Sequence, residues 1–238
     1  NFDIIDHYTY VLCGDGDMQE GVTYEAASLA GHLSLGKLIV LYDSNNITIE
    51  GNTDLAFTED VNKRMEASGF QTLTVEDGNN LEEISKAIEL AKSEKTKPSF
   101  ITVKTKIAFG CPAKEGSESS HGSPLGEENV KALRDNLGWE EQEAFVIPQD
   151  VYDNFAQKAK KGKEAEDNWN KLFKAYCEKY PEKKALWDKY FAVIDDEKLL
   201  NCDEFWSYED KPQATRSLSG NMINRLAKIM PNFWGGSA

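Results

Sequence analysis

An alternation of short apolar runs and longer amphipathic stretches between Tyr8 and Thr105 is the feature that most constrains this fold. Four apolar runs are predicted to be strands, at residues 9–13, 38–42, 71–75 and 99–104. The stretches 20–35 and 81–92 carry apolar faces at helical spacing, and Gly36 is expected to stand at C′ of the first helix. Strands that alternate with helices are typical of βαβ units, so we predict an α/β fold with a mainly parallel sheet.

Sequence patterns in the rest of the chain predict two domain boundaries. Residues 109–125 are rich in Gly, Ser and Pro and are predicted to form a long loop. Residues 149–190 are Lys/Glu-rich and helical, and a fresh amphipathic helix is expected at 214–230. We therefore expect a domain at 1–148, a helical connector at 149–211 and the start of another domain at 212–238. The missing initial Met and the unclosed end suggest a piece of a longer protein.

Composition excludes several classes of partner. The net charge of −14 over 238 residues argues against nucleic acid, which needs concentrated Lys and Arg. No apolar stretch approaches the ~18 residues of a membrane span, so no membrane partner is expected. The four cysteines are far apart and form no CxxC pair, which favours a reducing, cytoplasmic location. An anionic ligand would need a local positive charge, such as a metal ion, in order to bind.

Polar residues follow the first two predicted strands. Gly14, Asp15 and Gly16 end the first, and Asn45 and Ile47 follow the second. A GDG tripeptide alone is more often an ordinary turn. However, the carboxyl ends of parallel strands meet at one sheet edge, and Asn45 lies 45 − 15 = 30 positions after Asp15. A carboxylate, an amide oxygen and a backbone carbonyl suit Mg²⁺ or Ca²⁺, so a metal site is predicted there.

Five segments resemble transketolase. The longest is GDGDMQEGVTYEAASLAGHLSLGKLIVLYDSNNITIEG at residues 14–51. The others are SHGSPL at 120–125, FVIP at 145–148, and ATR at 214–216 with GGSA at 235–238. The resemblance covers nearly the whole chain and implies part of a parallel-sheet thiamine diphosphate-binding fold, followed by the helical connector and the start of the pyrimidine-binding domain.

The resemblance also implies a reaction. Transketolases are homodimers that move a two-carbon ketol unit from a ketose phosphate to an aldose phosphate in the pentose phosphate pathway, using thiamine diphosphate and a divalent metal, here Mg²⁺ or Ca²⁺. Asp15, Asn45 and the carbonyl of Ile47 match the family's metal ligands. Gly16, Asn45 and His121 match its cofactor contacts.

Three residues match other family roles. His121 matches a catalytic histidine that faces both the diphosphate and the substrate, although a lone loop histidine is usually a simple exposed residue. Arg216 matches an arginine that binds the sugar phosphate, although an exposed arginine near a helix start is common. Glu20 matches a carboxylate near the subunit interface.

The resemblance also indicates what the chain lacks. The family carboxylate that protonates the aminopyrimidine ring matches nothing up to residue 238, and several active-site histidines lie upstream of residue 1. The isolated chain is therefore expected to be inactive. Two alternatives stay open: dihydroxyacetone synthase, whose motifs are nearly the same, and a transketolase-like binding protein without catalysis.

Overall fold

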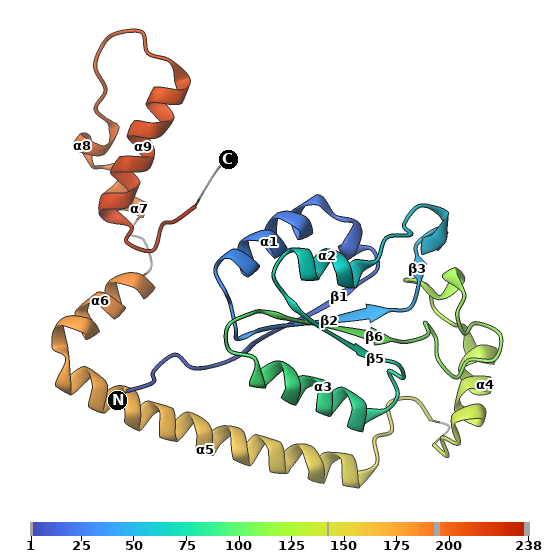
Figure 1. The fold of residues 1–238 in the computed structure, drawn as a ribbon. Helices are drawn as coiled ribbons and strands as arrows, with labels where there is room; N and C mark the ends of the chain where they lie inside the picture. Colours follow the sequence, from blue (N-terminus) through green and yellow to red (C-terminus); the bar gives the residue numbers. More distant parts are fainter. Residues whose placement is uncertain (1, 142, 193–195, 236–238) are drawn as a thin grey trace. The chain divides into compact units, whose positions relative to one another are not determined.

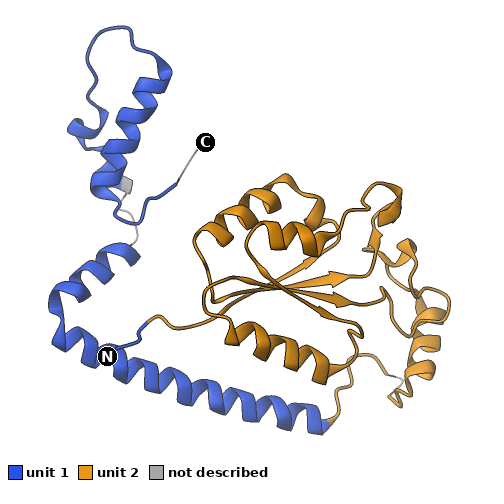
Figure 2. Ribbon diagram, in the orientation of Figure 1, with its two compact units in different colours: residues 1–4, 149–238 blue, residues 5–148 orange. Residues whose placement is uncertain are grey.

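The computed structural model describes residues 2–141, 143–192 and 196–235. The chain divides into two compact units (Figure 2). Residues 5–148 form one unit, and residues 1–4 with 149–238 form the other.

A four-stranded parallel sheet is the centre of the unit at 5–148. Its strands, in spatial order, are β1 (Thr9–Gly14), β2 (Leu38–Ser44), β6 (Ser99–Lys104) and β5 (Gln71–Val75). All three pairings are parallel, and β6 lies between β2 and β5 although it comes last in the sequence. The predicted α/β class and its parallel sheet are confirmed, with all four strands near their predicted positions.

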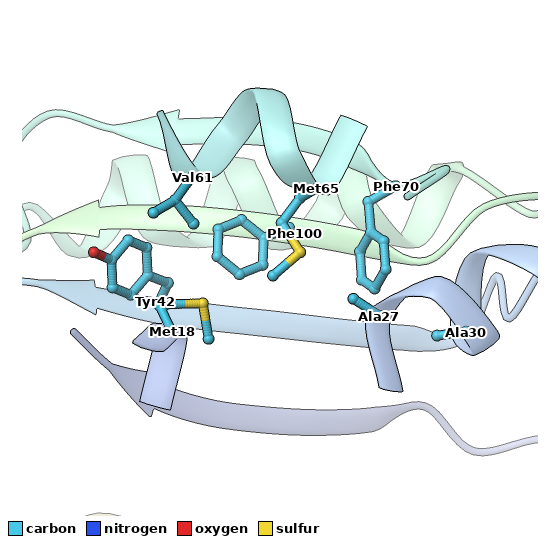
Figure 3. Packing of buried hydrophobic residues seen from close by; sticks show 8 residues of the cluster. All are labelled: Met18, Ala27, Ala30, Tyr42, Val61, Met65, Phe70 and Phe100. Carbon is cyan, nitrogen blue, oxygen red and sulfur yellow. The ribbon is translucent and has the colours of Figure 1, made fainter. Parts of the chain in front are cut away.

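Helices cover both faces of this sheet (Figure 1). They are α1 (Gly21–His32) and α2 (Val61–Ala67) on one face and α3 (Leu81–Ser93) on the other. The apolar cluster under α1 and α2 includes Met18, Tyr42, Met65 and Phe100 (Figure 3). The apolar cluster under α3 includes Ile39 and Ile101. The result is three layers, with β2 and β6 as the central strands and β6 the more deeply buried of the two.

The helix α2 was not predicted. It spans only seven residues, too few for a clear period, but Val61 and Met65 are one turn apart and both are buried. Asp60 caps it by accepting a hydrogen bond from the Lys63 N–H at 3.1 Å.

The end of α1 corrects one prediction. The helix ends at His32 with Leu33 as its C-cap, so the left-handed residue at C′ is Ser34, with φ of 55°, and not Gly36. Gly36 instead lies against another backbone segment, because a Cβ there would be 2.1 Å from the carbonyl oxygen of Lys95. Gly31 is constrained in the same way, since a Cβ there would be 1.7 Å from the carbonyl oxygen of Ser68.

The region after β6 contains a long loop and one helix. The predicted loop is ordered by local hydrogen bonds, including Gly110 N–H to Glu115 Oε2 at 2.8 Å, and contains a 3₁₀ turn at Glu118–Ser120. The helix α4 (Glu127–Leu137) was not predicted and ends at Gly138, which is left-handed with φ of 67°. Elsewhere, a short hairpin pairs β3 (Ile47–Thr48) with β4 (Gly51–Asn52).

The other unit is helical. Its elements are α5 (Gln149–Lys179), α6 (Pro181–Phe191), α7 (Asp196–Leu200), α8 (Asp203–Trp206) and α9 (Thr215–Ile229). The predicted helical segment is therefore broken at Pro181, which begins α6. Aromatic rings join α5 to α6, with the centroids of Phe173 and Trp187 4.8 Å apart. None of the described helices is long and apolar enough for a membrane span.

Candidate functional site

An open cleft of about 920 Å³ lies where the sheet strands end. Its lining comes from the segments that follow β1, β2 and β6, together with the loop that carries His121. Six of the seven site residues predicted from the sequence line it: Asp15, Gly16, Glu20, Asn45, Ile47 and His121. The fold thus brings together side chains that are up to 106 positions apart, from Asp15 to His121 (121 − 15 = 106).

Asp15 has the most constrained side chain in the cleft. It is 3% exposed, and both carboxylate oxygens accept hydrogen bonds. Oδ1 accepts from the hydroxyl of Tyr42 at 2.5 Å, and Oδ2 accepts from the N–H of Asn45 at 3.2 Å. No Lys or Arg in the described ranges forms an ion pair with it. A buried carboxylate without a counterion is costly, and a cation would compensate it.

The segment after β2 turns sharply beside Asp15. Asn46 is left-handed with φ of 61°, a conformation that Asn tolerates better than most residues. The side chain of Asn45 closes the turn, because its Oδ1 accepts from the N–H of Ile47 at 2.9 Å. Ile47 is 5% exposed and begins the short β3–β4 hairpin. The turn therefore brings an amide oxygen to the same cleft as the carboxylate.

Gly16 has no structural need to be glycine within this chain. Its φ is −64°, and a Cβ built there would meet no atom within 4 Å. Gly16 lines the cleft, so this free space belongs to the cleft. A ligand that approaches the backbone closely would account for the missing side chain.

His121 is exposed on the loop after β6. Its N–H donates to the carbonyl of Glu118 at 2.9 Å, and Gly122 next to it is left-handed with φ of 68°. Ser120 fastens the same turn by donating its hydroxyl to the carbonyl of Lys114 at 3.0 Å. These hydrogen bonds fix the shape of the turn that carries His121.

The cleft is strongly acidic. Five carboxylates line it, from Asp15, Asp17, Glu20, Asp43 and Glu50. The opposing cation is Lys106, which pairs with Glu115 at 3.0 Å. An anion with several charges would therefore be repelled unless a divalent cation accompanied it.

Two groups near these carboxylates, one half-buried and one buried, have raised pKa values. Burial, followed by the charges of Asp17, Asp43 and Asp15, raises the pKa of the Cys13 thiol to about 12. Burial and then the hydrogen bond to Asp15 raise the pKa of the Tyr42 phenol above its ordinary value. Both groups keep their protons at neutral pH, so Tyr42 is a permanent donor to Asp15.

The donor set is one of hard oxygens. The described residues contain no group of three or more His, Cys, Asp or Glu side chains arranged to hold a metal ion. The candidate ligands in the cleft are the Asp15 carboxylate, the Asn45 side-chain amide and the Ile47 backbone carbonyl, which leaves other coordination positions for ligand oxygens and water. Such a set fits Mg²⁺ or Ca²⁺ shared with a phosphate, and not a zinc site.

Comparison with known proteins decides the family. Residues 1–193 match the family described as "Transketolase, thiamine diphosphate binding domain". The chain belongs to the transketolase family. The predicted resemblance is confirmed, and with it the thiamine diphosphate-binding fold.

Transketolases of known sequence and structure match along nearly the whole chain. The transketolase of Bacillus subtilis is 46% identical over 241 residues, covering 100% of this chain and 36% of the relative. The structure of transketolase from Leishmania mexicana has a TM-score of 0.83 at 37% identity, covering 97% of this chain and 34% of that one. A Pichia stipitis transketolase solved in complex with sedoheptulose-7-phosphate has a TM-score of 0.79 at 35% identity, with 97% and 34% covered.

The chain therefore spans about a third of the length of these transketolases. The seventh predicted site residue, Arg216, lies in the first turn of α9, in the other unit, and is exposed. It forms no ion pair with another described residue. Of the predicted GGSA motif, residues 236–238 lie outside the described part of the chain.

Sequence reasoning missed several residues of the cleft. Asp43, Thr105 and Lys106 line it from the ends of β2 and β6. Tyr42, which contacts Asp15 without lining the cleft, is predicted from the sequence only as part of a strand. Its one sequence signal is a hydroxyl-bearing side chain in an apolar strand, three residues before Asn45.

Proposed function

We propose that the full-length protein is a transketolase that transfers a two-carbon ketol unit from a ketose phosphate to an aldose phosphate in the pentose phosphate pathway. The observation that carries the proposal is the cleft in which Asp15, Asn45, Ile47 and His121 meet. The Pichia stipitis relative solved with sedoheptulose-7-phosphate supports a sugar phosphate substrate.

The metal is part of this proposal. Asp15, the Asn45 amide and the Ile47 carbonyl would ligate Mg²⁺ or Ca²⁺, which would compensate both the buried carboxylate and the diphosphate. Gly16 and Asn45 would contact the diphosphate. Thiamine diphosphate supplies the carbanion chemistry of ketol transfer when it is bound. His121 would donate a hydrogen bond to an anionic oxygen of the cofactor or substrate, and Arg216 would bind the sugar phosphate.

We assign residues 1–148 to the diphosphate-side domain, 149–211 to the connector and 212–238 to the start of the pyrimidine-binding domain. A homodimer with Glu20 near its interface fits the exposed position of this carboxylate. A cytoplasmic location is supported by four cysteines that are all unpaired.

The direct test is an assay of the full-length protein with thiamine diphosphate and Mg²⁺. Transfer of the ketol unit from a ketose phosphate to an aldose phosphate is the expected result. Preferential use of formaldehyde as acceptor would instead identify a dihydroxyacetone synthase. Cofactor binding without turnover of any donor would identify a binding protein.

The isolated 238-residue chain is expected to have no ketol-transfer activity, since it spans only about a third of the matching transketolases. General acid and base groups at the pyrimidine ring would have to come from the rest of the protein. The purified chain and the full-length protein should be compared in the same coupled assay. Turnover by the isolated chain would mean that the catalytic residues have been misassigned.

Gly16→Ala in the full-length protein is expected to weaken thiamine diphosphate binding about 5- to 150-fold while leaving the free energy of unfolding nearly unchanged. The added methyl meets no atom of this chain but would crowd the diphosphate, and overpacking costs about 1–3 kcal/mol. Gly21→Ala is the matched control, because its added methyl also meets nothing and it does not line the cleft. Calorimetric titration should separate the two variants; equal affinities would remove Gly16 from the cofactor site.

A further inference from the structure

The Asp15 carboxylate accepts a hydrogen bond from a residue of the neighbouring strand. Asp15 follows β1, whereas the hydroxyl that donates to its Oδ1 at 2.5 Å belongs to Tyr42 of the neighbouring strand β2. An ionised carboxylate has about four lone-pair positions, and Tyr42 and Asn45 each use one. The remaining positions are free to ligate a cation.

Tyr42 reaches Asp15 from the side away from the cleft. Asp15 lines both the cleft and a second, smaller cavity of about 220 Å³, whereas Tyr42 lines only the second. That cavity also has polar walls, from Asn62 and Thr102 among others, so water could enter it and compete for the carboxylate. The Tyr42 hydroxyl fills this side of Asp15, so that water in the second cavity does not draw the carboxylate away from the cleft.

Packing holds the phenol ring of Tyr42 in place. The side chain is 4% exposed and its ring centroid is 5.6 Å from that of Phe100 on β6. Met18 and Val61 belong to the same cluster, and Figure 3 shows the phenol oxygen at the end of the cluster nearest the arrowheads of the strands. A ring fixed on several sides gives its hydroxyl one position, which is what a preorganised ligand requires.

We propose that Tyr42 is a positioning residue of the metal site, whose hydroxyl holds the Asp15 carboxylate in the orientation that ligates the divalent cation. This inference rests on the proposed metal site. Hydrogen-bonding partners behind metal ligands fix the orientation of those ligands, and their loss typically lowers metal affinity by roughly 10–100-fold. Tyr42 does not line the cleft, so it acts through Asp15 and not on substrate or cofactor.

The test is Tyr42→Phe in the full-length protein, which removes the hydroxyl and keeps the ring. Mg²⁺ is titrated calorimetrically in the presence of thiamine diphosphate, and its affinity is expected to fall roughly 10–100-fold. Activity is expected to recover at high Mg²⁺, because the reacting groups are unchanged. A purely structural role would lower the active fraction at every Mg²⁺ concentration and leave the affinity unaltered, and that result would overturn the proposal.

Tyr24→Phe is the matched control. Its hydroxyl also donates to a carboxylate, Glu59 Oε2 at 3.2 Å, but neither residue lines the cleft. Mg²⁺ affinity is expected to stay at the wild-type value in this variant. Asp15→Asn distinguishes an error in the role of Tyr42 from an error in the metal site. If it loses Mg²⁺ affinity and Tyr42→Phe does not, only the role of Tyr42 is wrong; if neither loses affinity, the metal site itself is wrong.

Discussion

Asp15→Asn is expected to lower the affinity of the full-length protein for thiamine diphosphate with Mg²⁺ by more than about 100-fold, beyond the roughly 10–100-fold typical of changes behind the ligands. Asp15 is the one anionic member of the proposed ligand set. Without it, the diphosphate would face a cleft that still carries four carboxylates, at Asp17, Glu20, Asp43 and Glu50. Isothermal titration with both ligands measures the effect.

The same substitution should spare the fold. An Asn carbonyl can accept the hydrogen bond of Asn45 N–H, and its amide can donate to the oxygen of Tyr42, so both polar contacts of Asp15 are replaced. Because a buried charge without a counterion is costly, the metal-free variant is expected to unfold with a free energy equal to or above that of the wild type.

Asp17→Asn is the control for charge alone. Asp17 also lines the cleft, but its exposed carboxylate accepts from the N–H of Gly14 at 2.8 Å and is not in the ligand set. Its effect on cofactor affinity is expected to be small. Unchanged affinity in Asp15→Asn, or an equal loss in both variants, would contradict the assignment of Asp15 as a metal ligand.

Arg216→Ala in the full-length protein is expected to raise KM for phosphorylated sugars about 10- to 150-fold. Hydrogen bonds to charged groups contribute about 1.5–3 kcal/mol, and a guanidinium can meet two phosphate oxygens at once. The side chain is exposed in the first turn of α9 and has no ion-pair partner among the described residues, so it is free to bind an anion. Cofactor affinity should stay near the wild-type value.

Hydroxypyruvate is the substrate control, because it has no phosphate to bind. Steady-state kinetics should show the loss for a ketose phosphate and little change for hydroxypyruvate. Lys228→Ala removes a positive charge near the other end of α9 and is expected to affect neither substrate. An equal loss for both substrates in Arg216→Ala would rule out the phosphate role.

Local patterns were sufficient for the strands of the sheet and for α3. The strands at 71–75 and 99–104 were predicted at their observed bounds, and α3 differs from its prediction by one residue. These patterns missed α2, whose single buried turn gives no measurable period, and α4, in which no residue is buried. The predicted role of Gly36 was wrong for another reason. A glycine is needed there because the backbone of Lys95 lies against it, and Lys95 is 59 positions away in the sequence (95 − 36 = 59).

The sequence by itself determined the α/β class, the strands and the residue types that suit a hard cation, because these depend on neighbours along the chain. It also placed Asp15 and Asn45 at one sheet edge, since parallel strands end together. Only the tertiary structure decided that β6 separates β2 from β5, and that Tyr42 supports Asp15 from behind. Both depend on which strands and side chains become neighbours across the sheet, and contacts between distant positions follow from packing of the whole unit and not from any local period.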